Sequence, residues 1–96
     1  MYIRMVIGEA INEDQVREFR TIYKDAIEPE ILKEPGIVGG EILFEDGGTM
    51  VMVLTKWNTR EDCLRYHSSR SYRQFVARTQ HLLTGNFVVK IFKEWE

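Results

Sequence analysis

Three ring-bearing side chains in the second half of the chain could bind and ionise an aromatic substrate. His67 is a candidate general base, because its ordinary pKa of about 6.5 suits removal of a phenolic proton. Tyr66 could hydrogen-bond a substrate oxygen, and Trp57 could supply a flat wall for an aromatic ring. An anionic ligand could be met by Arg4, Arg73 or Arg78.

Each of these residues also has a purely structural interpretation. Trp57 could anchor a core between sheet and helix, since tryptophan buries a large area. Tyr66 could lie at the rim of the core, and His67 could lie on a helix surface. Because the two residues are adjacent, they diverge by about 100° on a helix, so at most one points squarely into a given pocket. The arginines could instead be solvated or ion-paired.

The sequence carries no pattern for a metal site or a covalent nucleophile. Cys63 precedes His67 by one helical turn, but the pair offers too few ligands for a metal. A thiol on an apolar helix face usually behaves as a small buried hydrophobe. His81 suits a helix C-terminus, where the dipole favours positive charge. We therefore expect no metal.

Length and composition indicate one domain, residues 1–96, with 44% hydrophobic residues and a net charge of −2. The single cysteine excludes a disulfide scaffold. Weak acidity, and a third strand without the aromatic signature of RNA-binding domains, argue against nucleic acid. No apolar run approaches the roughly 20 residues that span a bilayer. We expect a cytoplasmic protein that binds neither nucleic acid nor membrane.

Hydrophobic periodicity predicts the order βαββαβ, an α+β ferredoxin-like arrangement with a four-stranded antiparallel sheet and two helices on one face. The predicted strands are 2–10, 37–45, 49–57 and 87–95. A first helix should follow an Asn12 cap and run to about Glu28, where Pro29 should break or kink it before a short second piece. A second helix should begin after Asn58–Thr59, loosen at Ser68–Ser69 and stop by Gly85.

The predicted strands are apolar on both faces, most clearly in residues 50–54 (MVMVL). Helices on one side cannot cover both faces of this sheet. Each large apolar side chain left in water forgoes about 1.5–3 kcal/mol of burial. A second copy of the chain is the simplest cover, in a two-fold symmetric pairing. Strand ends that are better buried than the pattern suggests would be the alternative.

Two short runs resemble the antibiotic biosynthesis monooxygenase domain family: 34–41 (EPGIVGGE) and 57–61 (WNTRE). Tyr72 and Phe75 stand where that family has a pair of helix aromatics. In many members a histidine follows the strand-end tryptophan by nine residues; here that position is Tyr66, and His67 comes one residue later. The resemblance covers essentially the whole chain.

The resemblance implies a homodimeric α+β barrel in which two four-stranded sheets face each other. It also implies a cofactor-independent monooxygenase acting on a small hydrophobic phenol or quinol. His67 and Tyr66 would be the catalytic residues, and Trp57, Tyr72 and Arg73 would bind the substrate. The alternative function is a non-catalytic dimeric module that binds a small molecule, such as heme, or serves in a stress response.

Overall fold

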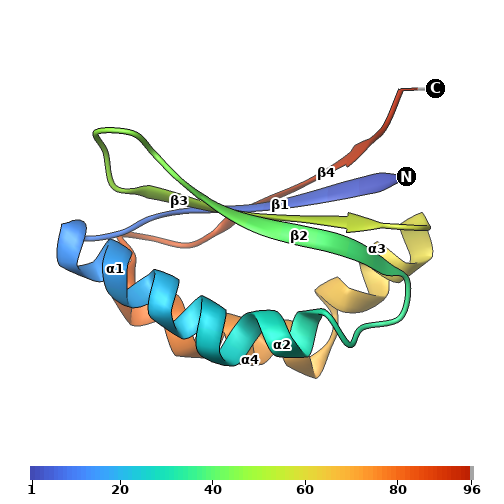
Figure 1. The fold of residues 1–96 in the computed structure, drawn as a ribbon, viewed down its shortest axis with the longest axis horizontal. Helices are drawn as coiled ribbons and strands as arrows, with labels where there is room; N and C mark the ends of the chain where they lie inside the picture. Colours follow the sequence, from blue (N-terminus) through green and yellow to red (C-terminus); the bar gives the residue numbers. More distant parts are fainter. Residues whose placement is uncertain (96) are drawn as a thin grey trace.

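The chain folds as one four-stranded sheet with every helix on the same side, as Figure 1 shows for the computed structural model, which describes residues 1–95. The strands are β1 (Tyr2–Glu9), β2 (Ile37–Phe44), β3 (Met50–Trp57) and β4 (Val88–Lys93). The helical segments are α1 (Glu13–Ile22), η1 (Tyr23–Ile27), α2 (Glu28–Ile31), α3 (Arg60–His67), α4 (Arg70–Thr79) and η2 (Gln80–Leu82). All neighbouring strands pair antiparallel in the order β2-β3-β1-β4. This confirms the predicted ferredoxin-like fold.

The sequence pattern predicted a break or a kink at Pro29 and then a short second helical piece. The structure has the short piece, α2, and the helical segments run into it without a break. Asn12 caps α1, and its Oδ1 accepts a hydrogen bond from the Gln15 backbone at 3.1 Å. The helix then widens into the π turn η1 and narrows again into α2. Pro29 lies in the first turn of α2, where a missing N–H costs little. The helix therefore continues far enough to bury Ile31.

The second helix divides more completely than the predicted loosening. Thr59 caps α3, because its hydroxyl accepts a hydrogen bond from the Asp62 backbone at 3.1 Å. Ser68 leaves the helical conformation, and Ser69 caps α4 by accepting from the Tyr72 backbone at 3.1 Å. The two serines thus end one helix and start the next. This break fixes the relative positions of the last residue of α3 and the first turn of α4.

The core lies between the sheet and the helices. Along β1 the inward side chains are Arg4 and Val6, while Ile3, Met5 and Ile7 face the other way. The largest buried aromatic side chains are Phe19, Tyr23, Trp57, Tyr66 and Phe75. Phe19 and Phe75 meet edge to face, with ring centroids 6.0 Å apart. The inward face is thus apolar except where Arg4 and Thr55 interrupt it.

The outward face of the sheet carries apolar side chains that no helix covers (Figure 1). The strand registers place nine of them on this face: Ile3, Met5, Ile7, Leu43, Met50, Met52, Leu54, Val88 and Phe92. Two shallow cavities of about 310 and 420 Å³ lie over them. The prediction that the strands are apolar on both faces is confirmed. Among the described residues, no helix has both the length and the hydropathy needed to cross a bilayer.

Gly36 should be intolerant of a side chain, and Gly39 is its matched control. Gly36 has φ +81°, and an added Cβ would lie 2.0 Å from an Asp62 carboxylate oxygen. Its carbonyl also accepts the Asn58 amide hydrogen bond at 2.8 Å. We expect Gly36→Ala to lower the free energy of unfolding by at least about 1–2 kcal/mol, the usual cost of left-handed backbone.

Gly39→Ala adds a Cβ with no heavy atom within 4 Å, so it should leave stability unchanged or slightly raised. Urea denaturation of both variants measures the difference. Equal stability of the two variants would contradict this description of the turn before β2.

Candidate functional site

A buried arginine lies at the centre of a polar cluster on the inward face of the sheet, beside α3 and α4. Arg4 is 1% exposed, and none of the ion pairs among residues 1–95 involves it. Its Nη2 lies 2.9 Å from Nδ1 of His67. Burying a cation without a carboxylate is costly, so the surrounding groups must compensate for the lost hydration.

Two tyrosine rings supply part of that compensation. The guanidinium carbon of Arg4 lies 4.1 Å from the ring centroid of Tyr72 and 5.0 Å from that of Tyr66. Both distances are within the range of a cation–π interaction, which strengthens when the pair is desolvated. Arg4 is thus held by two aromatic faces and one imidazole nitrogen.

The break between α3 and α4 creates this arrangement. His67 is the last residue of α3, and Tyr72 lies in the first turn of α4. On one continuous helix, side chains five positions apart would point about 140° apart. Here the rings of His67 and Tyr72 stack, with centroids 5.3 Å apart and planes at 29°. The helix break therefore brings both residues to the guanidinium, His67 through Nδ1 and Tyr72 through its ring face.

Trp57 supports the cluster from behind. Its ring stacks on Tyr66 at a centroid distance of 5.1 Å, and its exposed fraction is 0%. The indole Nε1 donates to the Thr55 hydroxyl at 2.9 Å. Thr55 in turn donates to the backbone carbonyl of Arg4 at 3.5 Å. This chain links the end of β3 to the strand position of Arg4.

Two buried polar atoms in the cluster lack a hydrogen-bond partner among the described residues: Nε of Arg4 and the hydroxyl oxygen of Tyr66. Both groups can donate a proton. An unsatisfied buried polar atom is uncommon in a folded protein, and such atoms gather where a ligand or ordered water completes the bonding. The cluster thus offers donors for an oxygen acceptor.

The contact between Arg4 and His67 also determines a protonation state. A guanidinium only donates, so Nδ1 of His67 must accept and the ring proton lies on Nε2. Burial, and then the charge of Arg4, lower the pKa of His67 below its ordinary value. Burial raises the pKa of Tyr66, although Arg4 opposes that change. At neutral pH, His67 is therefore an uncharged acceptor and Tyr66 an un-ionised donor.

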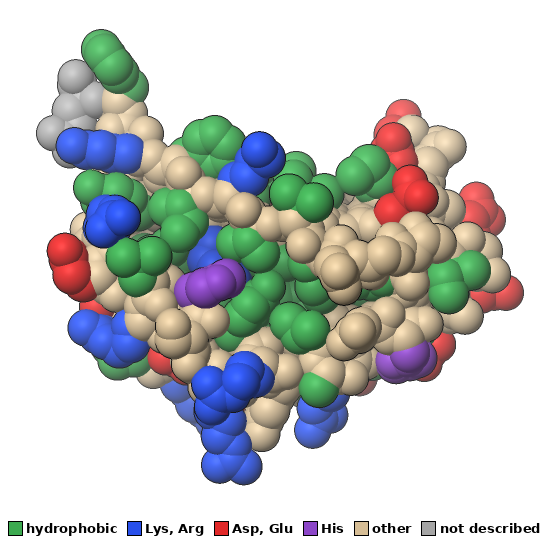
Figure 2. All heavy atoms as spheres, turned by 180° about the vertical axis from the view of Figure 1, so that it is seen from behind, with side chains coloured by type: hydrophobic (Ala, Val, Ile, Leu, Met, Phe, Trp, Pro, Cys, Tyr) green, Lys and Arg blue, Asp and Glu red, His purple; other side chains and the backbone are tan. Residues whose placement is uncertain are grey.

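A hollow of about 170 Å³ opens between α4 and the segment before β4, and Tyr72 lines it. Its remaining walls are Val76, Gln80, Leu83, Gly85, Asn86 and Phe87. Figure 2 shows this side of the molecule, where hydrophobic side chains gather in a depression and a histidine lies beside a recessed basic side chain. Tyr72 thus belongs both to the Arg4 cluster and to the wall of a small cavity that has apolar and polar walls.

The structure places the predicted site residues unequally. Tyr66, His67 and Tyr72 come together around one cation, whereas Trp57 is wholly enclosed behind Tyr66. Arg73 is exposed and donates to the Ser68 carbonyl at 2.8 Å, so it braces the helix break outside the cluster.

Sequence reasoning weighed Arg4 only as one of three arginines and did not place it at the centre. The sequence does contain a signal for its position. Side chains alternate between the two faces of a strand, so Arg4 points to the same, inward face as Val6 and Gly8. A charge on the buried side of a strand is the feature that points to it.

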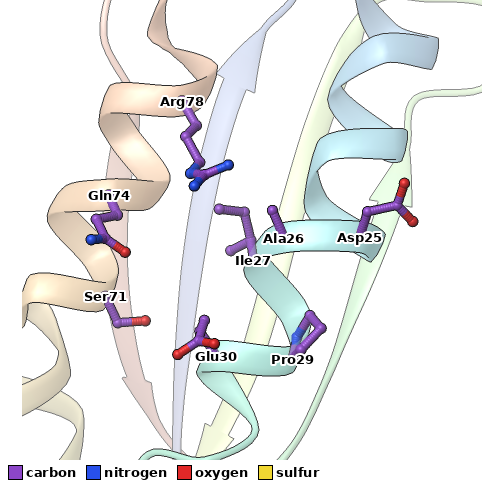
Figure 3. Close-up of a pocket in the computed structure, with 8 residues that line it drawn as sticks. All are labelled: Asp25, Ala26, Ile27, Pro29, Glu30, Ser71, Gln74 and Arg78. Carbon is purple, nitrogen blue, oxygen red and sulfur yellow. The ribbon is translucent and has the colours of Figure 1, made fainter.

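A second cavity of about 280 Å³ lies within the helix layer, between α4 and the η1–α2 segment (Figure 3). Its lining is Asp25, Ala26, Ile27, Pro29, Glu30, Ser71, Gln74 and Arg78. In Figure 3, Ser71 and Glu30 face each other across it, while the Asp25 carboxylate turns away. No aromatic side chain lines this cavity, so it is unsuited to a flat aromatic ligand.

Neither a metal nor a reactive thiol is suggested by the remaining polar groups. Across residues 1–95, no three His, Cys, Asp or Glu side chains gather as ligands. Cys63 is 0% exposed, and burial raises the pKa of its thiol against the opposing charges of Arg4 and Arg60. A buried, protonated thiol is a poor nucleophile.

Comparison with protein families gives one result that covers most of the chain. A sequence model of the antibiotic biosynthesis monooxygenase family, ABM, matches residues 2–78. A comparison with curated proteins gives no match.

Solved structures with the same fold are numerous and distant in sequence. Rv0793 from Mycobacterium tuberculosis is 16% identical, with a TM-score of 0.79 over 100% of this chain and 97% of that one. The ActVA-Orf6 monooxygenase of Streptomyces coelicolor, in complex with nanaomycin D, is 11% identical, with a TM-score of 0.86 over 99% of this chain and 88% of that one. SnoaB, a cofactor-independent oxygenase from Streptomyces nogalater, is 14% identical, with a TM-score of 0.79 over 99% and 94% of the two chains.

Replacing Arg4 by methionine should raise the pKa of His67. The substitution removes one of the two causes that depress it, while burial remains, so the rise should be partial. Arg20→Met, an exposed change on α1, is the control and should leave the titration of His67 unmoved. An NMR titration of the His67 ring protons measures both variants.

The lowered pKa of His67 makes the stability of the fold depend on pH. Because the folded pKa of His67 is lower than the unfolded one, the unfolded state binds more protons as pH falls below about 6.5. The contribution of His67 to stability should therefore be present above that pH and lost below it, less steeply in Arg4→Met. An unchanged His67 pKa in Arg4→Met would contradict the contact.

Proposed function

The chain belongs to the antibiotic biosynthesis monooxygenase family, and on this basis we propose that it is a cofactor-independent monooxygenase of small hydrophobic phenols or quinols. The observation that supports the proposal is the contact between Arg4 and the neutral His67 beside two tyrosine rings. It joins a proton acceptor to a fixed positive charge, and Tyr72 connects this pair to the neighbouring hollow. These are the groups that ionising a phenol requires.

The overall reaction would use dioxygen as the co-substrate. A phenol with a free ring position gives a quinone and one water, so one oxygen atom enters the product and the other leaves as water. The phenol loses four electrons and the dioxygen gains four. The ionised ring is the electron donor, which is why the protein's task would be to form and hold the anion.

Within that reaction, His67 would be the base and Arg4 would stabilise the anion. A phenol hydroxyl entering between them would transfer its proton to Nδ1 of His67. The phenolate oxygen would then accept hydrogen bonds from the guanidinium. The lowered pKa of His67 leaves it unprotonated at neutral pH, and the charge of Arg4 favours the phenolate.

The other predicted residues have graded roles in this proposal. The Tyr66 hydroxyl, which lacks a partner among residues 1–95, would donate to the substrate oxygen. Tyr72 would bind the substrate ring, since it lines the hollow. Trp57 would act through Tyr66, as a backing for its ring. Arg73 would contribute by bracing the α3–α4 break rather than by touching the substrate.

The proposal includes a homodimer formed through the outward face of the sheet. That face carries nine large apolar side chains over the four strands, and Glu41, Lys56 and Lys90 lie among them. Patches of this kind on a soluble chain mark an interface, and the commonest interface is a two-fold symmetric one. The hollow beside Tyr72 lies on the other side of the sheet, so each chain would keep its own site.

A non-catalytic binding module is the alternative, and one observation favours it. Tyr66 is only 1% exposed, so its hydroxyl could reach a ligand only with some opening of the cluster. Heme fits this alternative poorly. The hollow of about 170 Å³ is smaller than the roughly 300 Å³ at which pockets for drug-sized ligands begin.

Replacing His67 by alanine should lower turnover while the chain still folds. His67 is exposed, so its loss leaves no core cavity, but it takes away the acceptor of Arg4 and should cost about 1–3 kcal/mol of stability. We expect about 100- to 10,000-fold slower oxygen uptake with a reactive quinol, the usual contribution of a general base. His81→Ala, which is exposed on η2, is the control and should keep full activity. Unchanged turnover in His67→Ala would remove His67 from the mechanism.

A charge on the outward face should dissociate the dimer. Leu54 lies centrally on β3 and faces outward, so Leu54→Lys would bury an unpaired ammonium in the proposed interface. Sedimentation at micromolar concentration should show dimers for the native chain and monomers for Leu54→Lys. Leu32→Lys, at a 52% exposed position after α2, should remain dimeric. A native chain that sediments as a monomer would refute the proposed pairing.

A further inference from the structure

Arg4 is an unusual residue to find in a core, because no acidic side chain among residues 1–95 pairs with it. It is 1% exposed, its Nη2 contacts an uncharged imidazole, and its Nε has no partner within residues 1–95. Cation–π contacts hold the charge but do not use the remaining N–H donors. The bonding of this group is therefore incomplete without an oxygen acceptor.

The position of Arg4 in the sheet provides access to it. β4 is one of the two edge strands, and its Ile91 lies opposite Arg4 in the register. Ile91 is 38% exposed, although its register position faces the helix side, so the helices do not close over this edge. Figure 2 shows the depression on this side of the molecule. A small ligand could thus reach the cluster along the β4 edge.

The hollow beside the cluster suits a small ligand. Its volume is about 170 Å³, and a cavity of about 150 Å³ holds one benzene ring. Val76, Leu83 and Phe87 supply apolar walls, and Tyr72 joins the hollow to the guanidinium. The volume matches one aromatic ring and is small for a fused ring system.

We propose that Arg4 is the specificity-determining residue of this site, and that it selects a single-ring aromatic bound as an oxyanion. The ring would lie in the hollow against Tyr72. The negatively charged oxygen would accept from the guanidinium and from the Tyr66 hydroxyl, which completes the bonding of both buried groups. This inference rests on the proposed function, whose substrate class it narrows to one ring with an anionic oxygen.

The test is an equilibrium titration with para-nitrophenol, a single-ring phenol whose ionised form is yellow. Its nitro group withdraws electrons, so it reports binding without needing turnover. With excess native protein, the apparent pKa of the phenol should fall, because the bound phenolate lies beside a fixed cation. The neutral methyl ether, para-nitroanisole, should bind at least about tenfold more weakly, and a two-ring nitronaphthol should also bind more weakly.

Three variants localise the effect. Arg4→Met should lose the pKa shift and bind the phenolate about 10- to 100-fold more weakly, as expected when a charged hydrogen-bond partner is removed. An apolar replacement of a buried charge commonly preserves the fold, which circular dichroism checks. Arg4→Lys should retain part of the shift. Val76→Phe should lose binding by filling the hollow, while Arg20→Met should behave as the native chain.

The outcomes separate this inference from the proposed function. A phenol pKa that stays unchanged on the native protein, or an equal shift in Arg4→Met, would overturn the role of Arg4. Equal affinity for the nitronaphthol would overturn the one-ring limit. Neither result depends on oxygen uptake. The monooxygenase proposal could therefore fail while Arg4 still binds the phenolate. Equally, Arg4 could fail to bind the phenolate while the chain still consumes oxygen with a quinol.

Discussion

The inward face of this small α+β fold depends on a guanidinium that is buried without a carboxylate. Removing a cation from water costs several kcal/mol, and a neighbouring acid would normally offset that cost. Here the compensation comes from the faces of Tyr66 and Tyr72 and from the Nδ1 lone pair of His67. All three belong to the α3–α4 segment. The break between those helices is therefore a condition for placing Arg4 in the core.

Because side chains alternate between the two faces of each strand, the two faces of the sheet have different roles. Inward positions build the core and the Arg4 cluster, while outward positions form an apolar surface that the helices do not reach. In so short a chain, few polar side chains remain for chemistry. Arg4 faces inward from β1, the strand next to the edge strand β4. It provides a polar centre there without interrupting either apolar layer.

Much of the fold could be predicted from local signals, and the site could be predicted only in part. Asn12, Thr59 and Ser69 cap helices through their own side chains, so their roles are visible in the sequence. Pro29 correctly indicated a short second helical piece, but the π turn that joins this piece to α1 leaves no sequence mark. His67 and Tyr66 could be nominated from residue type. They meet around Arg4, and the contact between Arg4 and His67 joins residues 63 positions apart in the sequence. Strand alternation indicates that Arg4 faces inward, but only the tertiary structure shows which residues it contacts.

The central claim is that Arg4 donates to Nδ1 of a neutral His67, and the tautomer of that ring tests it most directly. Long-range proton–nitrogen correlation spectra at neutral pH distinguish the protonated ring nitrogen from the unprotonated one. The account predicts an unprotonated Nδ1 and a proton on Nε2. A proton on Nδ1 would leave Arg4 with no acceptor in this cluster, and would contradict the account.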